Sequence, residues 1–177
     1  MFRLIAITSP DFWPGEAQRI VQLLAGDIQL VHLRKPGSDL ESCAGLLASL
    51  PEWCQRRIVV HDHLELRDRF PLHGLHLNGR HPEPPVGYCG HLSCSCHTLE
   101  EVAVRKASMD YVFLSPIFDS ISKKGYSAAF TAAQLDDAAA RGIIDYKVVA
   151  LGGVTLQRIP QLQRWHFGGA AMLGSVW

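Results

Sequence analysis

Charged and imidazole side chains follow several short apolar runs of this sequence, at the points where the runs end. Arg34 follows one such run, and Asp62 follows another. A guanidinium can donate two parallel hydrogen bonds to phosphate oxygens, and a carboxylate can hold a divalent cation that bridges such oxygens. These residue types predict a site for small phosphorylated ligands. The other members of the set are His32, Lys35, His61, His81, Ser95 and His97.

Three further segments are suited to phosphate groups. Gly152 and Gly153 would let the backbone approach an anion, and a helix beginning after them would offer free N–H groups. Gly174 follows the last apolar run, and the loop 115–125 carries hydroxyl and ammonium groups. A single Gly-Gly pair is often only a tight turn. Three compatible segments together are therefore the stronger signal.

Eight short β-rich runs would position these residues, at 3–8, 28–33, 58–60, 74–77, 92–96, 111–114, 148–151 and 170–173. Most are almost continuously apolar, which is typical of parallel strands covered on both faces. Helix-like segments lie between several of them, at 16–25, 39–50, 98–107, 131–140 and 155–165. Repeated strand–helix units imply right-handed crossovers, and eight of them predict a compact α/β barrel of the TIM type, (β/α)8. An open doubly wound sheet is the alternative.

Two places are too short for a full helix. Residues 78–87 read NGRHPEPPVG, and their prolines indicate an irregular connector between the fourth and fifth strands. The sequence stops at Trp177, directly after the eighth strand, so whether there is a last helix stays open. No linker, repeat or low-complexity segment divides the sequence. We therefore expect residues 1–177 to form a single barrel domain.

The composition favours small-molecule ligands. The 177 residues include 17 basic and 17 acidic side chains, and no basic run offers a surface for nucleic acid. The N-terminal apolar run is too short for a signal peptide, and no later run is long enough to cross a membrane. We expect a cytoplasmic protein that binds neither nucleic acid nor membranes, with a homo-oligomeric state left open.

Three of the five cysteines crowd into residues 88–97, YCGHLSCSCH. A zinc site built from Cys94, Cys96, His91 and His97 is one interpretation, but no second pair with metal-ligand spacing occurs. If the segment is a strand, Cys94 and Cys96 face the helices while Ser93 and Ser95 face the other way. We favour structural thiols.

The motifs resemble those of thiamine phosphate synthases and their TenI-type thiazole tautomerase relatives, in the same order over nearly the whole chain. Val-His-Leu-Arg at 31–34 is similar to the family's Gln-x-Arg-x-Lys strand, and Val-His-Asp at 60–62 to its Asn-Asp turn. Gly-Leu-His-Leu at 74–77, Ser-Cys-His-Thr at 95–98, Ser-Pro-Ile-Phe at 115–118 and Ala-Leu-Gly-Gly-Val at 150–154 match further family motifs.

The resemblance implies a reaction that joins an aminopyrimidine methyl diphosphate to a thiazole phosphate and releases diphosphate. Such chemistry needs stabilisation of the leaving diphosphate more than a protein nucleophile. By resemblance, Arg34, Lys35 and Lys123 would hold the diphosphate, and Asp62 would contribute to Mg²⁺ binding. Ser95 would meet the pyrimidine. The thiazole phosphate would lie against Ser120, Ser122, Gly152 and Gly153.

The sequence also departs from the family pattern. His32 occupies the glutamine position, His61 the asparagine position, and Pro36 the position of the second basic residue, so that Lys35 would have to substitute. His81 aligns with the second metal-binding aspartate. Losing a carboxylate weakens a site for a hard cation and favours a softer metal or none.

Three functions therefore compete. The first is thiamine phosphate synthesis, for which Arg34, Asp62 and Lys123 are retained. The second is thiazole tautomerisation, in which His97 would carry a proton near neutral pH. The third is a non-catalytic barrel that binds thiazole phosphate or thiamine phosphate. A synthase ranks first.

Overall fold

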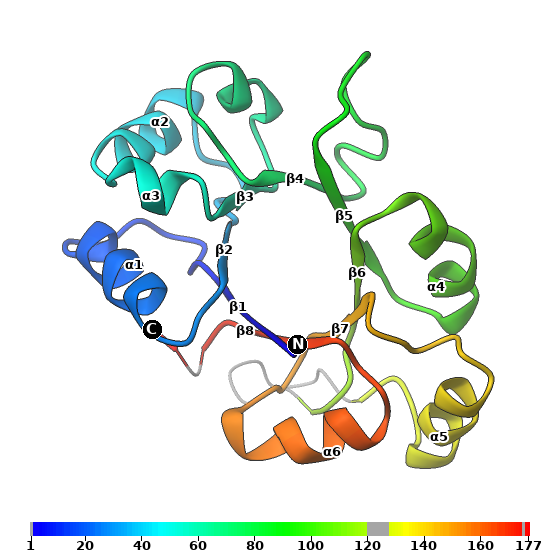
Figure 1. Ribbon diagram of the computed structural model, residues 1–177. Helices are drawn as coiled ribbons and strands as arrows, with labels where there is room; N and C mark the ends of the chain where they lie inside the picture. The colour runs from blue at the N-terminus through cyan, green and yellow to red at the C-terminus, as the bar shows by residue number, and fades with distance from the viewer. Residues whose placement is uncertain (1, 120–127, 175) are drawn as a thin grey trace.

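Eight parallel strands close into a barrel in the computed structural model, which describes residues 2–119, 128–174 and 176–177. The strands follow one another around the barrel in chain order, and β8 returns to pair with β1 (Figure 1). The predicted TIM-type fold is confirmed, and the open doubly wound sheet is wrong. The strands are β1 (Arg3–Ile7), β2 (Leu30–Leu33), β3 (Ile58–Val60), β4 (Gly74–Leu77), β5 (His91–Cys96), β6 (Tyr111–Leu114), β7 (Val148–Ala150) and β8 (Gly169–Met172).

The strands are continuously apolar because both of their faces are covered. Alternate side chains point outward into a large apolar layer beneath the helices, and the others fill a smaller core inside the barrel that includes Ile5, Val59 and Phe113. Cys94 and Cys96 lie buried in the outer layer as free thiols. The prediction that Cys94 and Cys96 face the helices is therefore confirmed.

The helices surround the barrel (Figure 1). They are α1 (Glu16–Ala25), α2 (Leu40–Ala48), α3 (Glu52–Gln55), α4 (Leu99–Arg105), α5 (Ala132–Ala140) and α6 (Ile159–Arg164). Asp39, Thr98 and Thr131 cap helices by accepting a hydrogen bond from a backbone N–H of the first turn. The carboxylate of Glu101, in the first turn of α4, accepts a hydrogen bond from the N–H of His97, the residue before the Thr98 cap.

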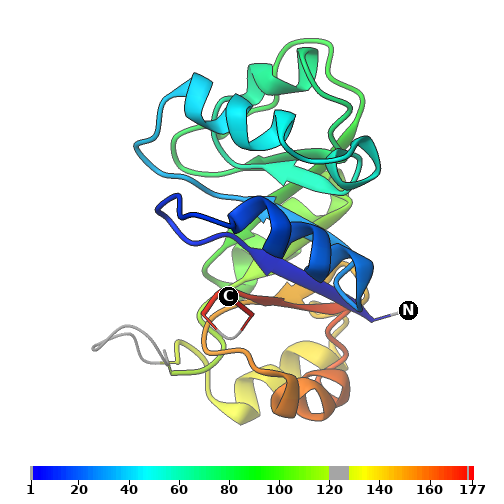
Figure 2. The same cartoon turned by 90° about the vertical axis from the view of Figure 1, so that its left-hand side faces the viewer.

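Two of the connections between strands contain no α-helix. A short 3₁₀ helix, Leu64–Asp68, follows β3, and residues 78–90 after β4 contain no helix, as their prolines predict. At the other end of the chain, the indole of Trp177 donates a hydrogen bond to the Ile7 carbonyl at 2.6 Å. The C-terminus thus lies beside the carboxyl ends of the strands, whereas the N-terminus lies at the opposite end (Figure 2).

Among the described residues, no helix is long and apolar enough to cross a membrane.

Candidate active site

The carboxyl ends of the strands bring most of the predicted site residues to one end of the barrel. Arg34 follows β2, Asp62 follows β3, His81 lies beyond β4, and His97 follows β5. The turn at Gly152 and Gly153, which follows β7, lies at the same end of the barrel. Ligand sites in barrels of this type form at this end, because the loops after the strands meet there.

Arg34 is held through its backbone while its side chain stays available. The hydroxyl of Thr8 accepts a hydrogen bond from the Arg34 N–H at 2.9 Å and donates to the Arg34 carbonyl at 3.1 Å. The side chain is half-buried, and its guanidinium makes no ion pair with the described residues. Arg34 is therefore fixed in place with a donor fork left for an anion.

Lys35 lies elsewhere than the sequence predicted. Lys35 is 1% exposed, and its ammonium donates to both carboxylate oxygens of Glu16, at 2.6 and 2.8 Å, and to the Asp11 carbonyl at 2.8 Å. The prediction that Lys35 holds diphosphate is therefore wrong for this structure. The cause is the alternation along the strand: Lys35 points outward toward α1, to the opposite face from Arg34.

The two carboxylate oxygens of Asp62 have different surroundings. Its Oδ1 accepts hydrogen bonds from Arg80, at 2.9 Å from Nε and 2.7 Å from Nη2. His81 Nε2 lies 4.0 Å from the same oxygen. Asp62 Oδ2 is buried and has no hydrogen-bond partner among the described residues. A buried carboxylate oxygen in this state fits a cation that also binds phosphate oxygens, since Mg²⁺ commonly takes only one or two protein carboxylates.

Three histidines meet inside the barrel just below these residues. His32 Nδ1 lies 2.8 Å from His61 Nε2, and His32 Nε2 lies 2.6 Å from the Tyr111 hydroxyl. His76 is hydrogen-bonded to the hydroxyls of Ser93 and Ser95, both at 2.9 Å. Burial holds the pKa values of His32 and His61 well below their usual range and lowers that of His76 to about 3. All three rings are neutral at neutral pH.

The burial of this cluster limits two predicted substrate contacts. His32 is completely buried, and His61 is 4% exposed. The prediction that His32 touches substrate directly is wrong for this structure, because its two ring nitrogens are engaged by His61 and Tyr111. Ser95 is partly accessible at the top of the cluster, where it supports His76.

His97 lies on the exposed rim of the same end. Its Nδ1 is 3.2 Å from the Ser115 carbonyl and 3.4 Å from the Ser115 hydroxyl. The ring is therefore oriented by the segment after β6 and remains accessible. Among the described residues, no charged or titratable side chain contacts the His97 imidazole.

The Gly152–Gly153 turn depends on both glycines. Their φ angles are +93° and +61°, in the left-handed region that L side chains rarely adopt. A Cβ on Gly153 would lie 2.2 Å from the Asp119 carbonyl oxygen, so the turn packs directly against the segment after β6. Gly174 is exposed after β8. Ser120, Ser122 and Lys123 lie outside the described residues.

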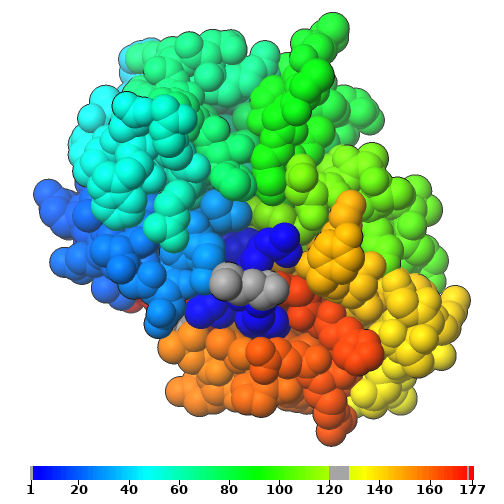
Figure 3. All heavy atoms as spheres, viewed as in Figure 1, coloured from blue at the N-terminus to red at the C-terminus, as the bar shows by residue number. Residues whose placement is uncertain are grey.

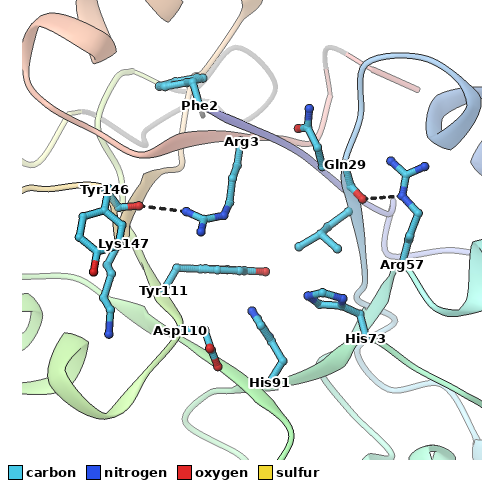
Figure 4. A pocket seen from close by; sticks show the side chains of 11 residues that line it. Phe2, Arg3, Gln29, Arg57, His73, His91, Asp110, Tyr111, Tyr146 and Lys147 are labelled. Carbon is cyan, nitrogen blue, oxygen red and sulfur yellow. Dashed lines mark hydrogen bonds between the residues drawn. The ribbon is translucent and has the colours of Figure 1, made fainter.

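The opposite end of the barrel contains a cavity of about 730 Å³. Figure 3 shows this face, and in Figure 4 Arg3, His73, His91 and Tyr111 point into the cavity. Two further basic side chains line the cavity, and both are hydrogen-bonded within the protein. Arg57 donates to backbone carbonyls, and so does Lys147. The cavity lies at the amino ends of the strands, and none of the residues predicted to bind phosphate or a divalent cation lines it.

Comparison with known proteins identifies the family. The family model described as thiamine monophosphate synthase matches residues 4–176. This match covers almost the entire chain. The chain belongs to the thiamine monophosphate synthase family.

Individual relatives agree with this assignment. A thiamine-phosphate synthase of Halalkalibacterium halodurans is 27% identical over 173 residues, which cover 91% of this chain and 81% of the relative. The crystal structure of a thiamine phosphate pyrophosphorylase from Bacteroides thetaiotaomicron superposes with a TM-score of 0.90 at 42% identity, over 99% of this chain and 85% of that one. A Pyrococcus furiosus structure, at 17% identity and a TM-score of 0.75, shows the shared fold alone.

Within this thiamine monophosphate synthase family member, sequence reasoning missed three supporting residues. Glu16 pairs with Lys35, Arg80 pairs with Asp62, and Tyr111 ends the hydrogen-bonded chain through His32. The partners of the first two lie 19 and 18 positions away in the sequence. Glu16 is the first residue of the predicted helix 16–25, where an acidic side chain is common, so no local signal indicated its role.

Proposed function

We propose that this protein is a thiamine phosphate synthase and that the mouth at the carboxyl ends of its strands is the active site. The observation that carries the proposal is the presence, at this mouth, of two groups that could bind a ligand. In the described part of the chain, Arg34 has a guanidinium without an acidic partner, and Asp62 has a buried oxygen without a hydrogen bond. Arg34 could bind the leaving diphosphate directly, and Asp62 could hold a cation that stabilises its negative charge.

The reaction requires the protein to stabilise charge rather than to form a covalent intermediate. The bond between the pyrimidine methylene carbon and the diphosphate oxygen breaks, and its electron pair leaves with the diphosphate. The methylene carbon, held as a delocalised pyrimidine cation, then bonds to the thiazole. The guanidinium of Arg34 would hold the departing oxygens by two parallel hydrogen bonds.

Asp62 would hold Mg²⁺ through Oδ2, with substrate phosphate oxygens completing the coordination. When bound, the ion would supply positive charge to the diphosphate and so make it a better leaving group. His81, near Asp62 Oδ1, takes the place of a second carboxylate and contributes no negative charge. We therefore expect weak binding of free Mg²⁺ and tighter binding when diphosphate is present.

The thiazole phosphate would bind on the other side of the mouth. The left-handed turn at Gly152 and Gly153 brings backbone close to the segment after β6, and Gly174 lies after the neighbouring strand. Ser120, Ser122 and Lys123 are proposed as further contacts on the resemblance alone. Ser95 and His97 would face the pyrimidine from β5.

Two variants test this assignment on the full-length protein. Arg34→Ala removes the anion-binding fork, and Asp62→Asn removes the charge of the cation ligand. Each is expected to lower kcat for thiamine phosphate formation by on the order of 10², since each removes a group that stabilises the transition state. Asp68→Asn is the matched control, because Asp68 is an exposed carboxylate on the 3₁₀ helix after β3. Full activity in Arg34→Ala or Asp62→Asn would refute the proposed roles.

A further inference from the structure

The three buried histidines of the barrel interior form a cluster that the proposed reaction does not use. His32 belongs to β2, His76 belongs to β4, and His61 directly follows β3 between them. One ring nitrogen from each lies within 4.8 Å of those of the other two. The side chains are 0%, 4% and 0% exposed for His32, His61 and His76. Three imidazoles thus converge inside a barrel, where bulky branched apolar side chains usually predominate.

The spacing of the nitrogens is close to that of a three-histidine metal site. Zinc–nitrogen bonds are about 2.0–2.1 Å, so ligand nitrogens around a tetrahedral ion lie about 3.4 Å apart. His32 Nδ1 and His61 Nε2 are 2.8 Å apart and would open slightly, in place of the hydrogen bond that now joins them. The rings of His61 and His76 are stacked, with centroids 4.1 Å apart and planes 19° from parallel. They would tilt toward the shared ion.

Hydroxyl groups hold two of the rings from outside the cluster. Tyr111 contacts the Nε2 of His32, and Ser93 and Ser95 contact the two nitrogens of His76. If His76 binds an ion through one nitrogen, the serine at the other nitrogen remains its partner. Histidine ligands in metal sites are commonly fixed by such a second hydrogen bond, which sets the orientation and tautomer of the ring.

The donor set selects the class of metal. The cluster offers only neutral imidazole nitrogens, without a carboxylate, which suits zinc and other first-row transition metals rather than Mg²⁺ or Ca²⁺. Phe113 lies against the rings of His32 and His76, with centroids 4.7 and 4.8 Å away, so one side of the cluster is apolar. Three protein ligands would leave a fourth position for water or another donor.

We propose that His32, His61 and His76 bind a zinc-class transition-metal ion inside the barrel, at a site separate from the hard-cation ligand Asp62. This site is independent of the proposed synthase reaction. Its occupancy can be measured without any substrate.

The test is metal binding by the full-length protein after removal of metal with EDTA. Equilibrium dialysis against Zn²⁺, followed by elemental analysis, is expected to give one bound ion per chain. Co²⁺ in place of Zn²⁺ is expected to give the visible absorption of a four-coordinate nitrogen site. His32→Gln, His61→Asn and His76→Gln should each weaken binding about tenfold or more, since each removes a ligand.

Two control variants separate this site from other histidines. His166→Asn removes an exposed histidine with a φ of +61°, a conformation that Asn tolerates, and should bind metal as the wild type does. His81→Asn tests the neighbourhood of Asp62 and should also leave binding unchanged. Circular dichroism melts establish whether each cluster variant is folded. The Co²⁺ spectrum of the wild-type protein gives an answer even if one cluster variant fails to fold.

The proposal is overturned by any of three results. These are less than stoichiometric Zn²⁺ with no Co²⁺ absorption in the wild type, unchanged affinity in the folded cluster variants, and loss of binding in His81→Asn or His166→Asn. Synthase activity plays no part in any of them, so failure here leaves the assignment of Arg34 and Asp62 to be judged by its own assay.

Discussion

Lys35 Nζ donates to both carboxylate oxygens of Glu16, at 2.6 and 2.8 Å, and neither side chain is more than 2% exposed. The pair joins the residue after Arg34 to the first residue of α1. A basic residue that the sequence assigned to substrate thus stabilises the loop that carries Arg34.

Replacing Glu16 with Gln is expected to destabilise the protein by about 3–5 kcal/mol, because it leaves the Lys35 ammonium buried without its counter-ion. Urea unfolding measures the loss. The control is Glu52→Gln, which breaks the exposed i,i+4 pair with Arg56 and should change stability by less than about 0.5 kcal/mol. Equal effects of the two substitutions would show that the buried pair has no special role.

Gly153→Ala should damage the thiazole-phosphate side of the mouth. The new Cβ would lie 2.2 Å from the Asp119 carbonyl oxygen, so the turn or the segment after β6 must shift. We expect a higher KM for thiazole phosphate and a stability loss of about 1–3 kcal/mol. Gly142→Ala is the control, since Gly142 also has a positive φ, +69°, but a Cβ added there would meet no atom within 4 Å. A KM change in Gly142→Ala equal to that in Gly153→Ala would contradict this account.

Stability should decline with acid below about pH 6.5. The pKa values of His76 and His91 are lowered by burial, to about 3 and about 4. Between those values and the unfolded value of about 6.5, the unfolded chain binds protons that the folded chain does not, so acid favours unfolding. The stabilisation is complete above pH 6.5 and is lost as pH falls.

Replacing His76 with Gln should make that decline shallower by about 1.4 kcal/mol per pH unit between pH 4 and pH 6. Urea unfolding at several pH values, with EDTA present to remove metal, gives the slope. His166→Asn, which removes an exposed histidine, is the control for histidine replacement. An unaltered slope in His76→Gln would mean that His76 is protonated in the folded protein.

Arg80→Ala is expected to lower the Mg²⁺ concentration that gives half-maximal activity. Arg80 neutralises Asp62 through Oδ1 at 2.7 Å, and a competing cation weakens the attraction of the carboxylate for a metal ion. Titration of activity with Mg²⁺ measures the change. A higher Mg²⁺ requirement in the variant would show that Arg80 supports the cation site instead of competing for it.

The barrel could be predicted from sequence because parallel strands covered on both faces are continuously apolar, and all eight runs proved to be strands. The helix boundaries were less accurate. The segment predicted at 39–50 ends at Ala48, and a separate short helix begins at Glu52, directly after Pro51.

The site was only partly predictable, because side-chain partners depend on register and direction. The contact between His32 and His61 follows from the pairing of Leu33 with Val60, which the sequence does not specify. His76 was recognised only as part of a strand motif. The pairing of Lys35 with Glu16 depends on how α1 packs against the loop after β2, which no local pattern reveals.

The most direct test of the synthase assignment is product formation by the purified full-length protein. It would be given the aminopyrimidine methyl diphosphate, the thiazole phosphate and Mg²⁺, and both products would be quantified over time. We predict thiamine phosphate and diphosphate in equal amounts, above a control without enzyme. Absence of thiamine phosphate above that control would contradict the assignment.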